Sequence, residues 1–247
     1  MRRLVRWTGG LSLLLVCVLI AGGCKAKPAR DAGFADSKLM APDPSLPFHK
    51  AWERPGHDGS RYRVLYVAPV NTSYMLKMTD WQQGERKDQI EKDVAKLGEY
   101  ARNALIKAFR EDKSRRFRVV DQPPTSPDAL VFEMALIEVV PSKVTLNALG
   151  YAPFFVGTTL NVVRGLANDV SSTAFEARVR DAATGEIVAL FADREQQQVA
   201  PISVRGLTWY SHAEAALNQW AAQFVQVANR KPGQRIKDSE PFTLMPW

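Results

Sequence analysis

Cys24 is the residue of this sequence to which a chemical role is most readily assigned. It directly follows Gly22 and Gly23, and an apolar stretch at 11–20 comes before them, behind a basic N-terminus. This order is typical of a lipoprotein export signal, in which a diacylglyceryl group alkylates the thiol and the chain is cleaved between Gly23 and Cys24. The apolar stretch is shorter than the ~20 residues of a membrane-spanning helix. An ordinary secretory signal or a signal anchor is the alternative.

Processing at Cys24 limits the chemistry left to the mature chain. The other cysteine, Cys17, leaves with segment 1–23, so no disulfide and no catalytic or metal-binding thiol is available. The loss of three arginines lowers the formal net charge from +7 to +4. This mild, dispersed excess and the export signal argue against nucleic acid as a partner. Lys25, rather than aspartate, follows the cysteine, which favours a palmitate-bearing anchor in the outer membrane.

Histidines are the other candidates for acid–base or metal chemistry. His49 and His57 precede the first expected strand, with Asp58 next to His57, but their spacing matches no metal-ligand motif. His212 is expected at the start of a helix, with its imidazole ring in the neutral form. No nucleophile elbow, zinc-protease, P-loop or dinucleotide motif is present. We therefore expect no catalytic site, no cofactor and no metal ion.

Glu133 and Glu138 are the carboxylate pair closest to an acid–base arrangement. They lie five positions apart in an expected strand, and side chains at odd spacing point to opposite faces of a straight strand. The sequence therefore predicts that the two carboxylates do not act together.

Hydrophobic periodicity predicts an α+β fold. Apolar residues recur every three or four positions over 85–111 and about 211–229, which indicates two long helices. Strands are expected at 62–70, 117–120, 129–140, 173–180 and 186–193, with a hairpin turn at 181–185 between the last two. This order predicts a two-layer sandwich of a mostly antiparallel sheet and two long helices.

The expected domain organisation has four parts. A signal peptide occupies 1–23, and an acylated cysteine with a flexible tether occupies 24–47, because that stretch has no apolar period. An α+β periplasmic domain is expected over 48–230 and a polar tail over 231–247. At about 3.3 Å per residue, the tether could extend roughly 75 Å from the membrane.

An insertion at 144–168 is the most suggestive stretch for partner binding. It is apolar and contains Gly150, Pro153 and Gly157, and an apolar inserted helix is expected from about residue 153. Its side chains either pack over the sheet or form an exposed partner surface, for which the candidates are Phe154, Phe155 and Leu160.

Three motifs resemble a known family. They are FHKAW at 48–52, YRVLYVAPVNT at 62–72 and DAATGE at 181–186, together with the helix that carries Trp220. The sequence resembles, over about 46–229, the bacterial lipoproteins grouped as domain of unknown function 3313. The resemblance implies an exported, lipidated α/β domain, and no activity is assigned to that family.

The sequence therefore favours a non-enzymatic periplasmic module, held in the outer membrane by its lipid, that binds another envelope protein. A hydrolase or transferase acting on an envelope polymer, using His49, His57 and Asp58, is one alternative. A structural subunit of an oligomeric envelope complex is another. The partner's identity and the oligomeric state stay open at this point.

Overall fold

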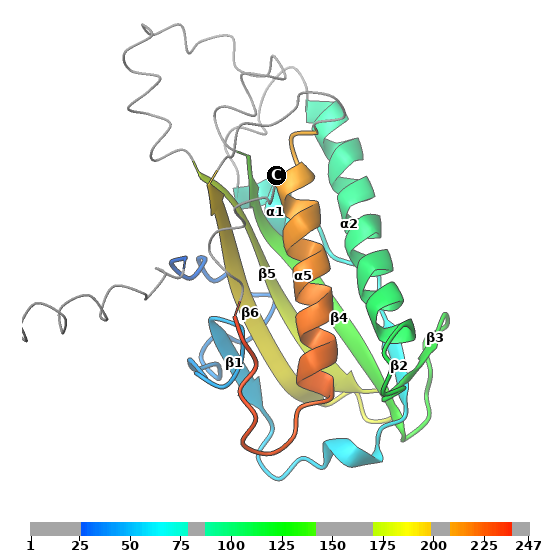
Figure 1. Cartoon of the computed structure of the whole chain (residues 1–247). Coiled ribbons are helices and arrows are strands. Elements are labelled where there is room, and N and C mark those ends of the chain that lie inside the picture. Colours follow the sequence, from blue (N-terminus) through cyan, green and yellow to red (C-terminus); the bar gives the residue numbers. More distant parts are fainter. Residues whose placement is uncertain (1–25, 79–86, 142–169, 199–207, 239–247) are drawn as a thin grey trace, which may run out of the picture.

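The computed structural model describes residues 26–78, 87–141, 170–198 and 208–238 (Figure 1). The fold is α+β, as predicted, with one six-stranded sheet in the order β1-β6-β5-β4-β2-β3. The described elements, in chain order, are β1 (Lys50–Glu53), η1 (Gly59–Arg61), β2 (Val64–Val67), α1 (Ser73–Met78), α2 (Lys87–Arg110), β3 (Arg118–Val120), β4 (Ala129–Val140), β5 (Val170–Asp181), β6 (Ile187–Gln198) and α5 (Ser211–Ala228).

The sheet is mixed, whereas the sequence predicted a mostly antiparallel one. β1, β6, β5 and β4 pair antiparallel, but β2 pairs in parallel with both β4 and β3. Parallel neighbours need a crossover connection, and α2 lies on the connection between β2 and β3. The predicted elements occur in the predicted order, but β1 and α1 were not predicted. Which strands pair depends on where the crossover connection places the next strand.

Helices α2 and α5 lie side by side on one face of the sheet (Figure 1). The predicted apolar stripe of α2 is buried there, and Trp220 on α5 is 0% exposed and meets Phe175 of β5 edge-on at 4.6 Å. Gly98 lets α2 approach the end of β2 closely, since a Cβ there would lie 2.8 Å from Thr72 Cγ2. Among the described residues, no helix is long and apolar enough to cross a bilayer.

The opposite face of the sheet carries residues 26–40 of the N-terminal segment, and Leu46 packs at the helix side, although the sequence predicted a flexible tether over 24–47. The carboxylate of Glu176, 2% exposed, accepts hydrogen bonds from the backbone N–H groups of Ala32 (2.7 Å), Phe34 (2.8 Å) and Ala35 (2.8 Å). A buried carboxylate needs such donors, and the segment supplies them. The prediction of a flexible tether is therefore wrong for residues 26–47. Periodicity failed here because the segment docks through backbone donors and through a few apolar side chains, such as Ala35 and Met40, that follow no regular spacing.

Boundaries elsewhere are close to the prediction. β4 spans the predicted 129–140, and β5 and β6 extend the predicted hairpin strands towards 170 and 198. The first part of the expected polar tail also packs: Ile236 is 3% exposed, and its N–H donates to the Ser45 carbonyl at 2.9 Å. The expected inserted helix at 144–168 lies outside the described residues.

Candidate functional site: an apolar cavity with a basic mouth

A cavity of about 560 Å³ lies where α2 and α5 end above the sheet. Its apolar walls come from the sheet, from the last turns of both helices and from the loop after β1. The side chains or backbone of Leu65, Phe109, Leu130, Phe132, Val179, Val188, Ala189, Phe191, Phe224, Val227 and Ala228 line it. A volume in the range of about 300–1,000 Å³ with mostly apolar walls is typical of small-molecule pockets.

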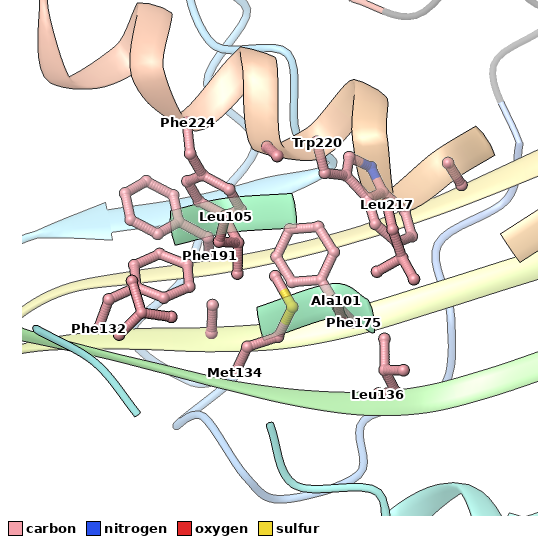
Figure 2. Packing of buried hydrophobic residues seen from close by; sticks show 14 of the residues in the cluster. Ala101, Leu105, Phe132, Met134, Leu136, Phe175, Phe191, Leu217, Trp220 and Phe224 are labelled. Atoms are coloured by element: carbon pink, nitrogen blue, oxygen red, sulfur yellow. The ribbon is translucent and has the colours of Figure 1, made fainter. Parts of the chain in front are cut away.

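Phe224 is the centre of the aromatic wall of this cavity. From α5 it points towards the sheet, between Phe132 and Phe191 (Figure 2). Its ring centroid lies 4.8 Å from that of Phe132, 5.4 Å from that of Phe191 and 4.7 Å from that of Phe48. These rings make edge-on and tilted contacts, which fix their positions. The wall is therefore a rigid aromatic surface.

The mouth of the cavity is polar, and Arg116 is its most firmly placed group. Its guanidinium donates to the backbone carbonyls of Gly59 (2.6 Å) and Tyr62 (2.5 Å), and its Cζ lies 4.6 Å from the centroid of the Phe117 ring. Burial lowers the pKa of Arg116, and the nearby charge of Arg63 lowers it further. Both arginines line the cavity.

The loop that presents Arg116 is fixed by Asp112. The Asp112 carboxylate accepts the N–H groups of Ser114 (3.0 Å) and Arg116 (3.2 Å). It also accepts the amide of Asn229, which follows α5, at 3.0 Å. Burial alone would raise the pKa of Asp112, but these hydrogen bonds lower it. The loop after α2 is thus tied to the end of α5, and the mouth keeps its shape.

A second carboxylate, that of Asp181, holds the loops together at the same end of the molecule. Asp181, 2% exposed, accepts the hydroxyl of Tyr62 (2.8 Å) and the N–H groups of Ala183 (2.9 Å) and Thr184 (3.0 Å), and it pairs with Arg61. Burial opposes ionisation, but these donors bring the pKa of Asp181 down to about 2. The predicted hairpin turn is present, and it also anchors the loop that borders the cavity.

The structure separates the residues of the hydrolase alternative. His57 lies at the cavity mouth and stacks on Tyr62 at 5.3 Å, where burial lowers its pKa. Asp58 does not orient it, because its carboxylate accepts the Ser60 N–H at 2.9 Å. His49 lies under the N-terminal segment, with Nδ1 2.5 Å from Asp193 and Nε2 against the carbonyl of Ala26.

Both ring nitrogens of His49 are therefore occupied, and its side chain is only 6% exposed. His212, near the other end of α5, donates from Nε2 to the Ser172 carbonyl at 3.4 Å. Burial lowers the pKa of His212 to about 4, so the ring is neutral at physiological pH, as expected from the sequence. Within the described residues, no group of three or more His, Cys, Asp or Glu side chains is arranged to hold a metal ion.

Glu133 and Glu138 share one face of the sheet, which corrects the prediction that they point to opposite sides. The register of β4 shifts between Leu136 and Glu138, so a β-bulge reverses the alternation. Glu133 pairs with Arg178 (2.5 Å) and Arg180 (2.8 Å) of β5, and Glu138 pairs with an arginine of β6 at 2.7 Å. Each carboxylate has its own cationic partner.

The residues that the sequence singled out for attachment and partner binding lie outside the described residues. They are Gly23 and Cys24 at the processing site, and Phe154, Phe155 and Leu160 in the insertion. Their roles stay predictions. The cavity was not predicted, because its lining residues are spread over eight helices and strands and the loops between them. The only sequence signal was the crowding of aromatic residues on the inward faces of β4, β6 and α5.

The chain was compared with solved structures and curated proteins. It has 10% identity to PelC from Paraburkholderia phytofirmans, solved as a dodecamer, over 70% of this chain and 95% of that one, with a TM-score of 0.35. A hypothetical protein of Chlamydia trachomatis has 9% identity over 68% and 96%, with a TM-score of 0.38. The Neisseria meningitidis lipoprotein GNA1162 has 11% identity over 68% and 99%, with a TM-score of 0.26.

Similarities this weak carry neither fold nor function to the chain. No curated protein matches it. The family suggested by the three sequence motifs is confirmed, however, because the family model described as "Protein of unknown function (DUF3313)" matches residues 30–224. The chain therefore belongs to the DUF3313 family.

Proposed function

We propose that this protein is a lipid-anchored binding module of the bacterial envelope that holds a small apolar ligand in the cavity between α5 and the sheet. The observation that carries the proposal is the cavity itself, about 560 Å³ in volume and walled by Phe132, Phe191 and Phe224. Aromatic walls held by their own packing form a preformed pocket, and preformed apolar pockets are the usual sites for small ligands.

Binding, rather than catalysis, is supported by the placement of the histidines. Of the two in the hydrolase alternative, His57 reaches the mouth, and no carboxylate within hydrogen-bonding distance orients it among the described residues. The attachment through Cys24 to the periplasmic face of the outer membrane rests on the signal sequence and on Lys25. A protein partner bound through Phe154, Phe155 and Leu160 is compatible with this arrangement.

Ligand binding in the cavity is tested with a substitution that fills part of the cavity with a larger side chain. Val227→Trp on α5 places a large ring into the space while leaving the aromatic wall intact. Every contact described above lies within 26–238, so the mature polypeptide with Cys24→Ser, exported behind an ordinary secretory signal, retains the packed body. We expect this polypeptide to bind the neutral dye N-phenylnaphthylamine with a fluorescence increase, and Val227→Trp to lose that binding.

The matched control is Ala222→Trp, which puts the same ring on the exposed side of the same helix. This variant should bind the dye as the parent does, and both variants should melt within a few degrees of it. Equal dye binding by Val227→Trp and Ala222→Trp would show that the cavity is not the binding site.

A further inference from the structure

The charge at the cavity mouth has a feature that an apolar ligand alone does not explain. Arg63 and Arg116 both line the cavity, and each is close enough to the other for their charges to interact. Among the described residues, neither guanidinium forms an ion pair with a carboxylate within 4 Å, whereas Arg230 at the same mouth lies 4.0 Å from Asp43.

The nearby acids balance part of this charge, but among the described residues none forms an ion pair with either arginine. Asp43 and Glu53 line the same cavity. The Asp58 carboxylate accepts the Ser60 N–H, and its charge reaches Arg116 only from beyond ion-pair distance. The guanidinium of Arg116 donates hydrogen bonds to two backbone carbonyls. These neutral acceptors fix its position and leave its positive charge in place. Two like charges beside an apolar hole form a receptor for an anion that is attached to an apolar group.

The backbone around Arg63 is equally fixed. Its N–H donates to the Asp128 carbonyl at 2.8 Å, and its own carbonyl accepts the Arg118 N–H at 2.8 Å. The side chain of Arg63 is exposed, so it stands free at the entrance. An anion at the entrance would meet one guanidinium with spare donors and a second one that is rigidly held.

The size of the cavity suits the apolar part of such a ligand. Its volume of about 560 Å³ lies within the range of about 300–1,000 Å³ that is typical of small-molecule pockets. The cavity therefore has room for a hydrocarbon chain.

We infer that the cavity binds an anionic amphiphile, with its hydrocarbon tail against Phe132, Phe191 and Phe224 and its anionic head at Arg63 and Arg116. This inference rests on the proposed function, because it names the ligand class of the same cavity. The head is a carboxylate or a phosphate monoester, and both match the donor geometry of a guanidinium.

The experiment displaces N-phenylnaphthylamine from the mature polypeptide with amphiphiles of equal tail length, each below its micelle concentration. Laurate and dodecyl phosphate carry the two anionic heads, monolaurin is neutral, and dodecyltrimethylammonium is cationic. We expect both anions to displace the dye at concentrations at least about tenfold lower than the cation, the ratio that one charge-assisted hydrogen bond supplies. Each methylene added to the carboxylate series should raise affinity about threefold to fourfold.

Arg63→Gln tests the proposed site of the anionic head. Because the Arg63 side chain is exposed, the substitution should not affect folding. It should weaken laurate about tenfold relative to neutral monolaurin, and Arg63→Glu should reverse the preference towards the cation. Arg30→Gln is the matched control, because Arg30 is an exposed arginine of the N-terminal segment, which packs on the other face of the sheet. It should behave as the parent does.

The outcomes separate the two proposals. If no amphiphile and no dye binds, the proposed function fails, and this inference fails with it. If the dye binds and all four amphiphiles displace it equally in the parent and in Arg63→Gln, the cavity is an apolar site without charge selection, and only this inference is overturned.

Discussion

At the residue scale, two buried titratable groups make this fold sensitive to acid. Burial lowers the pKa of His212 to about 4, below the ordinary value of 6.5, so the unfolded chain takes up a proton first as pH falls. Hydrogen bonds hold the pKa of Asp181 at about 2, below 3.8, because the folded state stabilises the carboxylate. Both groups therefore stabilise the protein at neutral pH.

The two contributions should be lost in separate pH windows. The contribution of His212 is complete above about pH 6.5 and falls as pH drops towards 4, and that of Asp181 falls from about pH 4 to 2. One group contributes at most about 1.4 kcal/mol per pH unit to the slope. Urea unfolding at several pH values should show a shallower decline between 6.5 and 4 for His212→Gln than for the parent.

Asp181→Asn gives the matched comparison, because it should flatten the decline only below about pH 4. It should also destabilise the protein at pH 7 by about 1–3 kcal/mol, since charge-assisted hydrogen bonds of the carboxylate are lost. Identical slopes for His212→Gln and the parent over 6.5 to 4 would mean that His212 is not buried in the neutral form.

At the scale of elements, α5 takes part both in the packed core and in the wall of the cavity. Its middle buries Trp220, whose Nε1 donates to Asp193 at 2.8 Å, and its last turns line the cavity through Phe224 and Val227. Asp193 also holds His49, so the same carboxylate joins α5 to the loop before β1. Substitutions in the middle and in the last turns of α5 should therefore have different effects.

Trp220→Ala should destabilise the domain by about 3–5 kcal/mol, the usual penalty for truncating a buried tryptophan. The change also leaves the buried Asp193 carboxylate without one of its donors. Trp220→Phe retains most of the apolar volume and should lose considerably less. An unchanged urea midpoint for Trp220→Ala would contradict the packing of α5 on the sheet.

At the scale of the whole molecule, the docked N-terminal segment places the domain next to its anchor. Ala26 already contacts His49, and Arg194 donates to the Lys27 carbonyl at 3.3 Å. Only Lys25 separates Ala26 from Cys24, a reach of about 8 Å at 3.8 Å per residue. If Cys24 carries the lipid, the domain lies against the membrane surface and does not stand about 75 Å away from it.

Energy transfer to the membrane tests this geometry. A donor fluorophore on the exposed position Lys38→Cys of the lipidated protein, in vesicles with acceptor-labelled lipids, should show high transfer. A Gly/Ser spacer of 20 residues between Lys25 and Ala26, spanning ~25 Å on average, should reduce that transfer. The unlipidated Cys24→Ser protein should show none. Equal transfer with and without the spacer would mean that the native segment is already extended.

Hydrophobic periodicity in the sequence was sufficient to predict the helices and strands that bury one face in the core. The stripe of α2, the apolar run of β4 and the alternation of β5 are each set by local side-chain spacing, so their positions were predicted to within a few residues. The family was also accessible, because its motifs are contiguous. The signal at Cys24 is likewise a contiguous pattern, and it stays a prediction.

Only the tertiary structure decided the features that depend on groups far apart in the chain. Docking of segment 26–47 depends in part on backbone N–H groups that donate hydrogen bonds to Glu176. Because every residue except proline has such a donor, the sequence does not show which ones will be used. The bulge that brings Glu133 and Glu138 to one face is a one-residue shift that strand alternation cannot reveal. The cavity and the arginines at its mouth come from eight helices and strands and the loops between them, so no local pattern contains them.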